Sequence, residues 1–183
     1  MIENVEVDEP LGLDAYAEAV HLASAVRALR EAATPLVARL RGRRLWMVNS
    51  TAQGGGVAEM LPRLVSILNE LGLETQWAVI GTDQPLFFEL TKRLHNLIHG
   101  TGDPGLTDED AQLYAAVSSE NAVDLKGRLR KGDIVVIHDP QPLGVGAQLK
   151  QELGIPFFFR CHIGLDEETP ETRAAWNFLQ PYA

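Results

Sequence analysis

Four short apolar runs alternate with longer segments of helical periodicity, and this alternation restricts the possible folds more than any other feature of the sequence. The runs span residues 44–49, 75–80, 133–138 and 156–162. They are rich in β-branched and aromatic residues and mostly lack polar alternation, as expected for strands buried on both faces of a parallel sheet. The helical patterns span residues 57–71, 85–98, 107–129 and 143–153. The sequence therefore predicts an α/β fold with a doubly wound, mostly parallel, Rossmann-like sheet.

The residues before the first run are expected to form a helical lead segment. Residues 14–41 carry apolar side chains at helical spacing. Pro35 is expected to split them into two helices, because proline removes a backbone donor and crowds the preceding turn. We therefore predict a lead segment over residues 1–40 and a Rossmann-like domain over residues 41–183.

Composition and charge exclude several classes of partner. The formal net charge of -9 argues against binding to nucleic acid or to an anionic membrane, because those surfaces select basic patches. No run reaches the roughly 18 apolar residues that a membrane-spanning helix needs, and the acidic start lacks the pattern of a signal peptide. We therefore expect a cytoplasmic protein. Cys161 is the one cysteine, so neither an internal disulfide nor a cysteine zinc site is expected.

Three consecutive glycines, Gly54, Gly55 and Gly56, separate the first apolar run from the next helical segment. Glycine is costly to order, and it allows a ligand to approach the backbone closely. A helix that begins near Val57 would also point its positive end at this loop, which favours a phosphate or sugar oxygen. The alternative is a tight turn without a ligand. Glu59 stands where the dinucleotide fingerprint needs a glycine, so NAD and FAD are disfavoured and no cofactor is expected.

Polar residues also follow the last two apolar runs, where ligands bind in sheets of this kind. His138 and Asp139 end one run, and Arg160 and His162 end the other. Strand alternation places Cys161 on the opposite face from His162, which argues against a thiol–imidazole pair and makes Cys161 a core residue.

Two metal sites are conceivable from the sequence, but neither is favoured. One would use His138, Asp139, His162 and Asp166, but their spacing does not require it. The other would use the acidic residues 108–110. With Thr107 before them, these residues fit a helix N-cap and an acidic first turn better. We therefore expect no metal.

Four motifs together resemble the N-terminal domain of the retaining, trehalose-forming glycosyltransferases, to which the trehalose phosphorylases are related. The motifs read VNSTAQGGGVAEML, TKRLHNLIHG, VIHDPQPL and FFFRCHIGLD, in that order. The resemblance extends from about residue 36 to the end of the chain and is weaker before it.

The resemblance implies transfer of glucose from a nucleotide-glucose donor to free glucose, with retention, to form trehalose. It also implies roles for individual residues. Gly54, Gly55 and Gly56 would approach the donor phosphates and the glucosyl group, and His162 and Arg160 would be catalytic. The acceptor side would hold His95, Asn96, His138, Asp139, Gln141 and, from a shifted position, Asp166.

The resemblance further implies a C-terminal nucleotide-binding domain that residues 1–183 do not contain. The chain is accordingly expected to be the acceptor-side half of a two-domain enzyme and inactive by itself, with an exposed mouth free to pair with a second copy. Two alternatives stay open. One is the N-terminal domain of a trehalose phosphorylase, and the other is a non-catalytic α/β module that binds a phosphorylated ligand.

Overall fold

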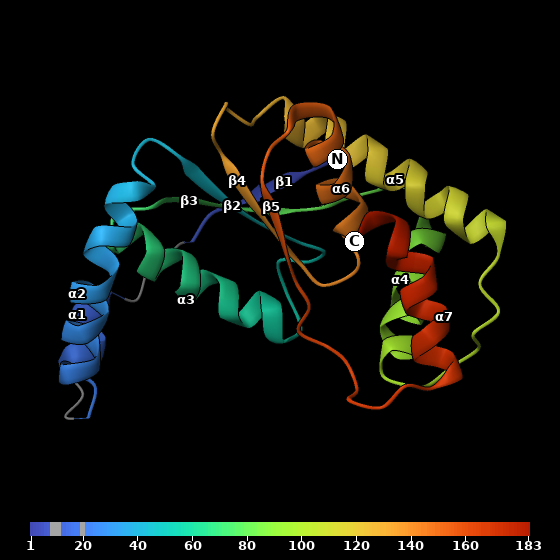
Figure 1. Cartoon of the computed structure of the whole chain (residues 1–183), viewed down its shortest axis with the longest axis horizontal. Coiled ribbons are helices and arrows are strands. Elements are labelled where there is room, and N and C mark those ends of the chain that lie inside the picture. The colour runs from blue at the N-terminus through green and yellow to red at the C-terminus, as the bar shows by residue number, and fades with distance from the viewer. Residues whose placement is uncertain (8–11, 19–20) are drawn as a thin grey trace.

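The computed structural model describes residues 1–7, 12–18 and 21–183. Within those residues, five strands form one sheet in the order β1-β3-β2-β4-β5 (Figure 1). The strands are β1 (Glu3–Val5), β2 (Arg44–Asn49), β3 (Glu74–Val79), β4 (Ile134–His138) and β5 (Phe157–Arg160). β2 pairs in parallel with β3 and β4, and β4 pairs in parallel with β5. β1 alone runs antiparallel, along β3. The predicted mostly parallel α/β sheet is confirmed.

Helices connect the strands and cover the sheet. They are α1 (Leu13–Glu18), α2 (Ala23–Arg39), α3 (Gly56–Glu70), α4 (Pro85–Ile98), α5 (Asp108–Lys126), α6 (Leu143–Leu153) and α7 (Pro170–Leu179), followed by the short 3-10 helix η1 (Gln180–Tyr182). The predicted bounds of β2, α4 and α6 coincide with the structure. The predicted strand at 156–162 ends earlier, at Arg160.

The sequence reasoning missed three elements, β1, α7 and the short η1 that follows α7. β1 is only three residues long and takes its stability from pairing with β3. α7 begins with a capping box in which Thr169 and Thr172 exchange hydrogen bonds between side chain and backbone, with Pro170 in the first turn. That local signal was available in the sequence, because threonine before proline is a common helix start.

The prediction that Pro35 splits the lead segment is wrong. α2 runs without interruption through Pro35, which lies inside it. The predicted segment 14–41 also includes residues 19–20, which lie outside the described residues. A proline removes one backbone donor from a helix interior. Glu31, whose carbonyl would have accepted that bond, is exposed, so water can replace the missing donor.

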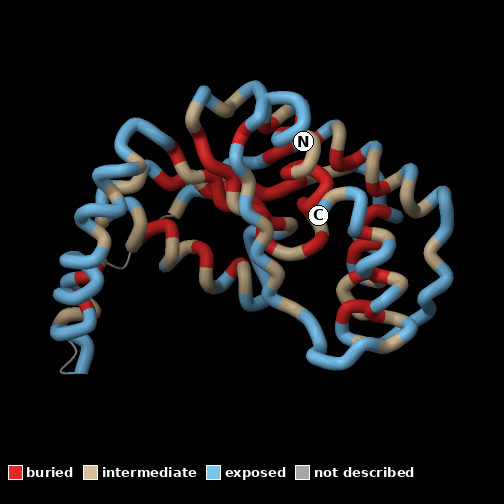
Figure 2. Tube along the Cα trace, viewed as in Figure 1, coloured by how far each residue is buried: buried red, intermediate tan, exposed pale blue. Residues whose placement is uncertain are grey.

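Both faces of the sheet are covered, as a doubly wound fold requires. Trp46 and Val48 of β2 face one core cluster, to which α4, α5, α6 and α7 contribute. Met47 of β2 and Trp77 of β3 face the other, which packs against α3. Figure 2 shows the buried residues concentrated in the strands and the inner sides of these helices, whereas α2 is mostly exposed.

The last strand departs from the prediction that all four runs are buried on both faces. β5 lies at the edge of the sheet, and its residues alternate between half-buried and exposed. Phe157 and Phe159 pack against the larger core cluster, whereas Phe158 is 59% exposed. Only one of the two faces of β5 is covered by other residues, so the apolar composition of the run overstated its burial.

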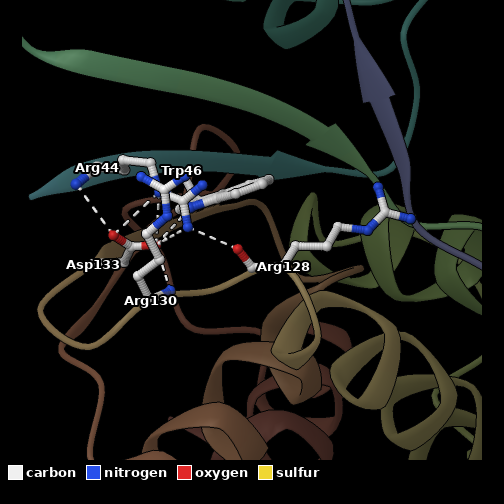
Figure 3. A network of polar contacts seen from close by, with 5 residues as sticks. All are labelled: Arg44, Trp46, Arg128, Arg130 and Asp133. Atoms are coloured by element: carbon white, nitrogen blue, oxygen red, sulfur yellow. Dashed lines mark hydrogen bonds and ion pairs between the residues drawn. The ribbon is translucent and has the colours of Figure 1, made fainter.

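A buried polar network joins the amino ends of β2 and β4 (Figure 3). The Asp133 carboxylate accepts from the Arg44 guanidinium at 2.7 Å, from Trp46 Nε1 at 3.1 Å and from the Arg130 N–H at 2.9 Å. Arg44 Nη2 also donates to the carbonyl of Arg128 at 2.7 Å. Burial alone would raise the pKa of Asp133, but these hydrogen bonds, that of Arg44 foremost, outweigh it and hold the pKa below its ordinary value. Asp133 is therefore ionised in the folded protein.

We expect Asp133→Asn to lower the free energy of unfolding by about 3–5 kcal/mol, because it leaves the buried Arg44 cation without its counter-charge. The matched change Asp83→Asn, at an exposed residue, should stay within about 0.5 kcal/mol of the unmodified protein. Urea unfolding followed by circular dichroism measures both. Equal stability of the two variants would contradict a structural role for the network.

Candidate functional site

A cleft of about 360 Å³ opens at the carboxyl ends of β2, β4 and β5. Its lining combines a glycine-rich loop, histidines and short polar side chains. The residues are Asn49, Ser50, Thr51, Gly54, Gly55, Gly56, Val57, Ala58, His95, His138, Asp139, Gln141, His162 and Ile163. Ligand sites in open α/β sheets occupy this edge, so the cleft is the candidate functional site.

The glycine loop leaves its backbone open to the cleft. Gly54 and Gly55 have φ angles of 73° and 93°, which side-chain-bearing residues rarely adopt. A Cβ atom added to Gly54, Gly55 or Gly56 would meet no atom within 4 Å, so the space beside the loop is unfilled. Gly55 is the N-cap of α3, and no side chain caps this helix. The first N–H groups of α3 therefore remain available for an oxygen of a ligand.

Asn49 holds the start of this loop in place. Its Nδ2 donates to the carbonyl of Thr51 at 2.7 Å, and its Oδ1 accepts from Trp77 Nε1 at 2.8 Å. The side chain is buried at the end of β2. The loop is thus anchored to the sheet before it enters the glycines.

His138 and His162 form a pair in the lining of the cleft. Nδ1 of His138 lies 2.9 Å from Nε2 of His162, and the two rings are nearly parallel, with centroids 5.2 Å apart. Nε2 of His138 lies 3.3 Å from the sulfur of Met47. Asp139, at a φ of 65°, accepts from the backbone N–H of His162 at 2.7 Å. This contact ties the segment after β5 to the end of β4.

Strand register explains why these side chains meet. Met47 pairs with Val136, and His138 pairs with Arg160, across neighbouring parallel strands. Since alternate residues of a strand point to the same face, Met47, His138, Arg160 and the following His162 all belong to the face that α3 covers.

Burial and neighbouring positive charge lower the pKa values of two histidines of the site, His138 and His95, and favour their neutral forms. Burial is the largest effect on His138, followed by the proximity of His162 and Arg160, and together they lower its pKa to about 4. Burial also lowers the pKa of His95, as do Lys92 and His99, while Asp139 opposes the change. A neutral imidazole offers one donor and one acceptor nitrogen, so His95 is suited to bind hydroxyl groups.

A second hollow of about 420 Å³ adjoins the cleft on the side of α4. It shares Ser50, Thr51, His95 and Gln141 with the cleft and adds Phe88, Thr91 and Lys92. The sequence reasoning missed these three residues, although Phe88, Thr91, Lys92 and His95 follow the spacing of one helical face.

The chemistry of the second hollow suits a polar, uncharged or anionic ligand. None of the residues that line it is a carboxylate. Lys92 makes no ion pair among the described residues. Gln141 Oε1 is buried and has no hydrogen-bond partner within the same residues. Phe88 exposes 42% of its surface and offers an apolar ring beside them.

The structure gathers most, but not all, of the predicted site residues. Gly54, Gly55, Gly56, His95, His138, Asp139, Gln141 and His162 line the cleft. Asn96, Arg160 and Asp166 do not. The carbonyl of Asn96 accepts hydrogen bonds at the end of α4, Arg160 is exposed on β5, and Asp166 is exposed in the segment before α7. The functional roles of all these residues stay predictions.

Cys161 was predicted to be a core residue, but it is only half-buried. Its Sγ lies 3.2 Å from the carbonyl oxygen of Ile163. Burial raises the pKa of its thiol.

Within residues 1–7, 12–18 and 21–183, no group of three or more histidine, cysteine, aspartate or glutamate side chains is placed to hold a metal ion. The helices of the same residues include none long and apolar enough to cross a membrane.

Comparison with known proteins gives consistent matches. Residues 47–183 match the family model described as "Trehalose synthase, N-terminal domain". A trehalose synthase from Rubrobacter xylanophilus is 40% identical over 154 residues, which cover 80% of this chain and 34% of that protein. A trehalose synthase from Thermococcus litoralis is 39% identical over 136 residues, covering 74% of this chain and 31% of that protein. A trehalose phosphorylase from Grifola frondosa is 31% identical over 144 residues, covering 72% of this chain and 20% of that protein. The matched segments thus span between 20% and 34% of the length of these relatives.

The buried, neutral His138 predicts a specific pH dependence of stability. The pKa of His138 is lowered in the folded protein, so the unfolded protein binds the extra proton first as the pH falls. Stability should therefore be full above the ordinary histidine pKa and decrease toward the folded value of about 4. Between about pH 7 and pH 5, His138 should remove about 2 kcal/mol from the free energy of unfolding.

Urea unfolding at a series of pH values tests this. His138→Asn should reduce the pH dependence over that range, whereas His21→Asn, at an exposed histidine, should leave it unchanged. The same slope in His138→Asn and in the unmodified protein would mean that His138 is not the group responsible.

Proposed function

The chain belongs to the trehalose synthase N-terminal domain family, and on this premise we propose that it is the acceptor-side domain of a retaining glycosyltransferase. The reaction is transfer of glucose from a nucleotide-glucose donor to the anomeric hydroxyl of glucose, which forms trehalose. The observation that carries the proposal is a cleft in which an uncapped helix N-terminus and open glycines lie next to His162, beside a hollow without carboxylates.

The donor occupies the side of the cleft formed by the glycine loop. The open backbone at Gly54, Gly55 and Gly56 leaves room for the glucosyl group and its phosphate. The uncapped N–H groups of α3 and the positive end of its dipole favour the phosphate oxygens. His162 contacts the transferred sugar, and the exposed Arg160 supplies positive charge beside the cleft.

The acceptor glucose occupies the second hollow. Its hydroxyl groups are bound by Lys92, by Ser50 and by the side-chain amide of Gln141, all of which line the hollow. The ring of Phe88 packs against the apolar face of the pyranose. His95 and Gln141 line both spaces, so they stand between the two sugars.

The chemistry that we propose places few demands on side-chain acids and bases. The bond between the anomeric carbon and the donor phosphate breaks while the acceptor oxygen attacks from the same face. The proton of the acceptor hydroxyl passes to a leaving phosphate oxygen. The protein contributes orientation and charge stabilisation, which backbone N–H groups and neutral imidazoles provide.

We further propose that the nucleotide is bound by a second domain outside residues 1–183. The matched relatives are at least about three times as long as the segment they share with this chain. Catalysis then needs both halves of the cleft, because orientation of two substrates contributes roughly 7–11 kcal/mol to barrier lowering. A trehalose phosphorylase is the second candidate, since the Grifola frondosa protein also matches. That reaction would move the glucosyl group between trehalose and inorganic phosphate.

Assays of the whole protein and of residues 1–183 alone test the function. With a nucleotide-glucose donor and glucose, the whole protein should form trehalose, and the chain alone should form none. Trehalose cleavage that depends on inorganic phosphate and not on a nucleoside diphosphate would establish the phosphorylase instead. Absence of both reactions in the whole protein would favour a non-catalytic module. A chain alone that is as active as the whole protein would contradict the second-domain proposal.

Two substitutions should separate the donor side from the acceptor side. Gly56→Ala adds one methyl group where no protein atom lies within 4 Å, at a position without positive φ, so the fold should tolerate it. We expect it to lower kcat/KM for the donor by about tenfold to a hundredfold, because the methyl group displaces the ligand. Lys92→Met should raise KM for glucose about tenfold or more through loss of a charged hydrogen bond. Steady-state kinetics with each substrate varied in turn measures both effects.

The matched control is Lys150→Met. Lys150 belongs to α6, its ammonium group lies over the ring of Phe157 in β5, and it lines neither space. It should leave both KM values unchanged. Equal effects of Gly56→Ala and Lys92→Met on both substrates would contradict the assignment of two separate sides.

A further inference from the structure

Both ring nitrogens of His138 have partners inside the protein. Nδ1 lies 2.9 Å from Nε2 of His162, and Nε2 lies 3.3 Å from the sulfur of Met47. The residue is only 1% exposed. His138 therefore has no free nitrogen with which to bind a ligand directly, and any effect it has on a ligand must pass through His162.

Met47 determines where the proton of His138 sits. A thioether sulfur accepts a hydrogen bond and cannot donate one. If Nε2 of His138 were bare, its lone pair would face the sulfur in a buried place, and both groups would lack a donor. Nε2 of His138 therefore carries the hydrogen. Because burial keeps His138 neutral, the ring holds only this one proton, and Nδ1 is bare.

The bare Nδ1 of His138 in turn determines the state of His162. At 2.9 Å the two nitrogens are within hydrogen-bond distance, so Nε2 of His162 must be the donor. In neutral His162, the second nitrogen, Nδ1, is then bare. No described residue forms a hydrogen bond with this nitrogen, and His162 lines the cleft.

We propose that Met47 and His138 are positioning residues that fix the tautomer of His162, so that Nδ1 of His162 accepts a hydrogen bond from a hydroxyl group of the bound sugar. The opposite arrangement, with the proton of His138 on Nδ1, would make Nδ1 of His162 a donor. The two arrangements differ in what the sugar must supply at this point, a hydroxyl hydrogen or an oxygen lone pair. The sugar part of the proposal rests on the proposed function, whereas the tautomers do not.

Nuclear magnetic resonance of the histidine side chains tests the tautomers without any ligand. The chain has five histidines, and spectra of His138→Asn and His162→Asn assign the two relevant rings. Long-range proton–nitrogen correlations at neutral pH should identify Nε2 as the protonated nitrogen and Nδ1 as the bare one in both rings. A coupling across the hydrogen bond should connect Nε2 of His162 with Nδ1 of His138. A proton on Nδ1 of His138 would overturn the proposal.

Substitution of the sulfur tests whether Met47 sets the tautomer. Met47→Leu keeps an apolar side chain of similar size but removes the acceptor, and it should change the ratio of the two His162 tautomers by about fivefold. Met60→Leu makes the same change on α3, at a methionine that packs in the same cluster without a recorded contact to either histidine among the described residues, and should leave the ratio unchanged. An unchanged ratio in Met47→Leu would overturn the role of Met47.

Catalysis tests the sugar part. In the whole protein, Met47→Leu should lower kcat/KM for trehalose formation by about fivefold, in proportion to the lost tautomer, and Met60→Leu should not. Full activity of Met47→Leu with a changed tautomer ratio would overturn the contact with the sugar. If the unmodified whole protein forms no trehalose, the proposed function fails and the sugar part fails with it, while the tautomer measurement still decides the rest.

Discussion

The parallel pairing of β2 with β4 is the constraint on which the rest of the structure depends, and the buried Asp133 carboxylate sets its register. This single group binds Arg44 and Trp46 at the start of β2 and the Arg130 N–H in the turn before β4. A buried charge tolerates little displacement from its partners, since an unpaired one is costly. With the amino ends of the two strands fixed in this way, their carboxyl ends reach the opposite edge of the sheet together. Met47 and His138 then fall on one face, close enough for contact.

The two ends of the sheet differ in how their polar groups are used. At the amino end, the Asp133 carboxylate is fully engaged with the chain itself (Figure 3). At the carboxyl end, the first N–H groups of α3 have no side-chain cap. Satisfied buried groups contribute stability, whereas groups left open in a cleft are free to bind a ligand. Because these two kinds of polar group lie at opposite ends of the strands, the site can keep unpaired polar groups without weakening the pairing of β2 with β4.

Much of the candidate site could be predicted because its residues directly follow apolar runs. Position after a strand identified Gly54 to Gly56, His138 and His162, all of which line the cleft. Phe88 and Lys92 gave no such signal, because they lie within α4 and reach the site only by the way that helix packs. The contact between Met47 and His138 was equally hidden, since it joins residues 91 apart in the chain. Asn96 and Asp166 were predicted from motif resemblance, and Arg160 also from its position at a strand end, but none of the three lines the cleft. Neither a motif nor a place after a strand fixes the direction of each side chain.

The sequence by itself determined the α/β alternation, the bounds of β2, α4 and α6, and the family resemblance, because these depend on local periodicity and on motifs that are contiguous in the chain. It did not determine the antiparallel β1, the one-sided burial of β5 or the continuity of α2 through Pro35, since each depends on what packs nearby. Tertiary structure alone decided the partners of His138. Hydrogen-bond roles of an imidazole depend on which atoms stand within about 3 Å of each nitrogen, and only the folded sheet brings Met47 and His162 to those two positions.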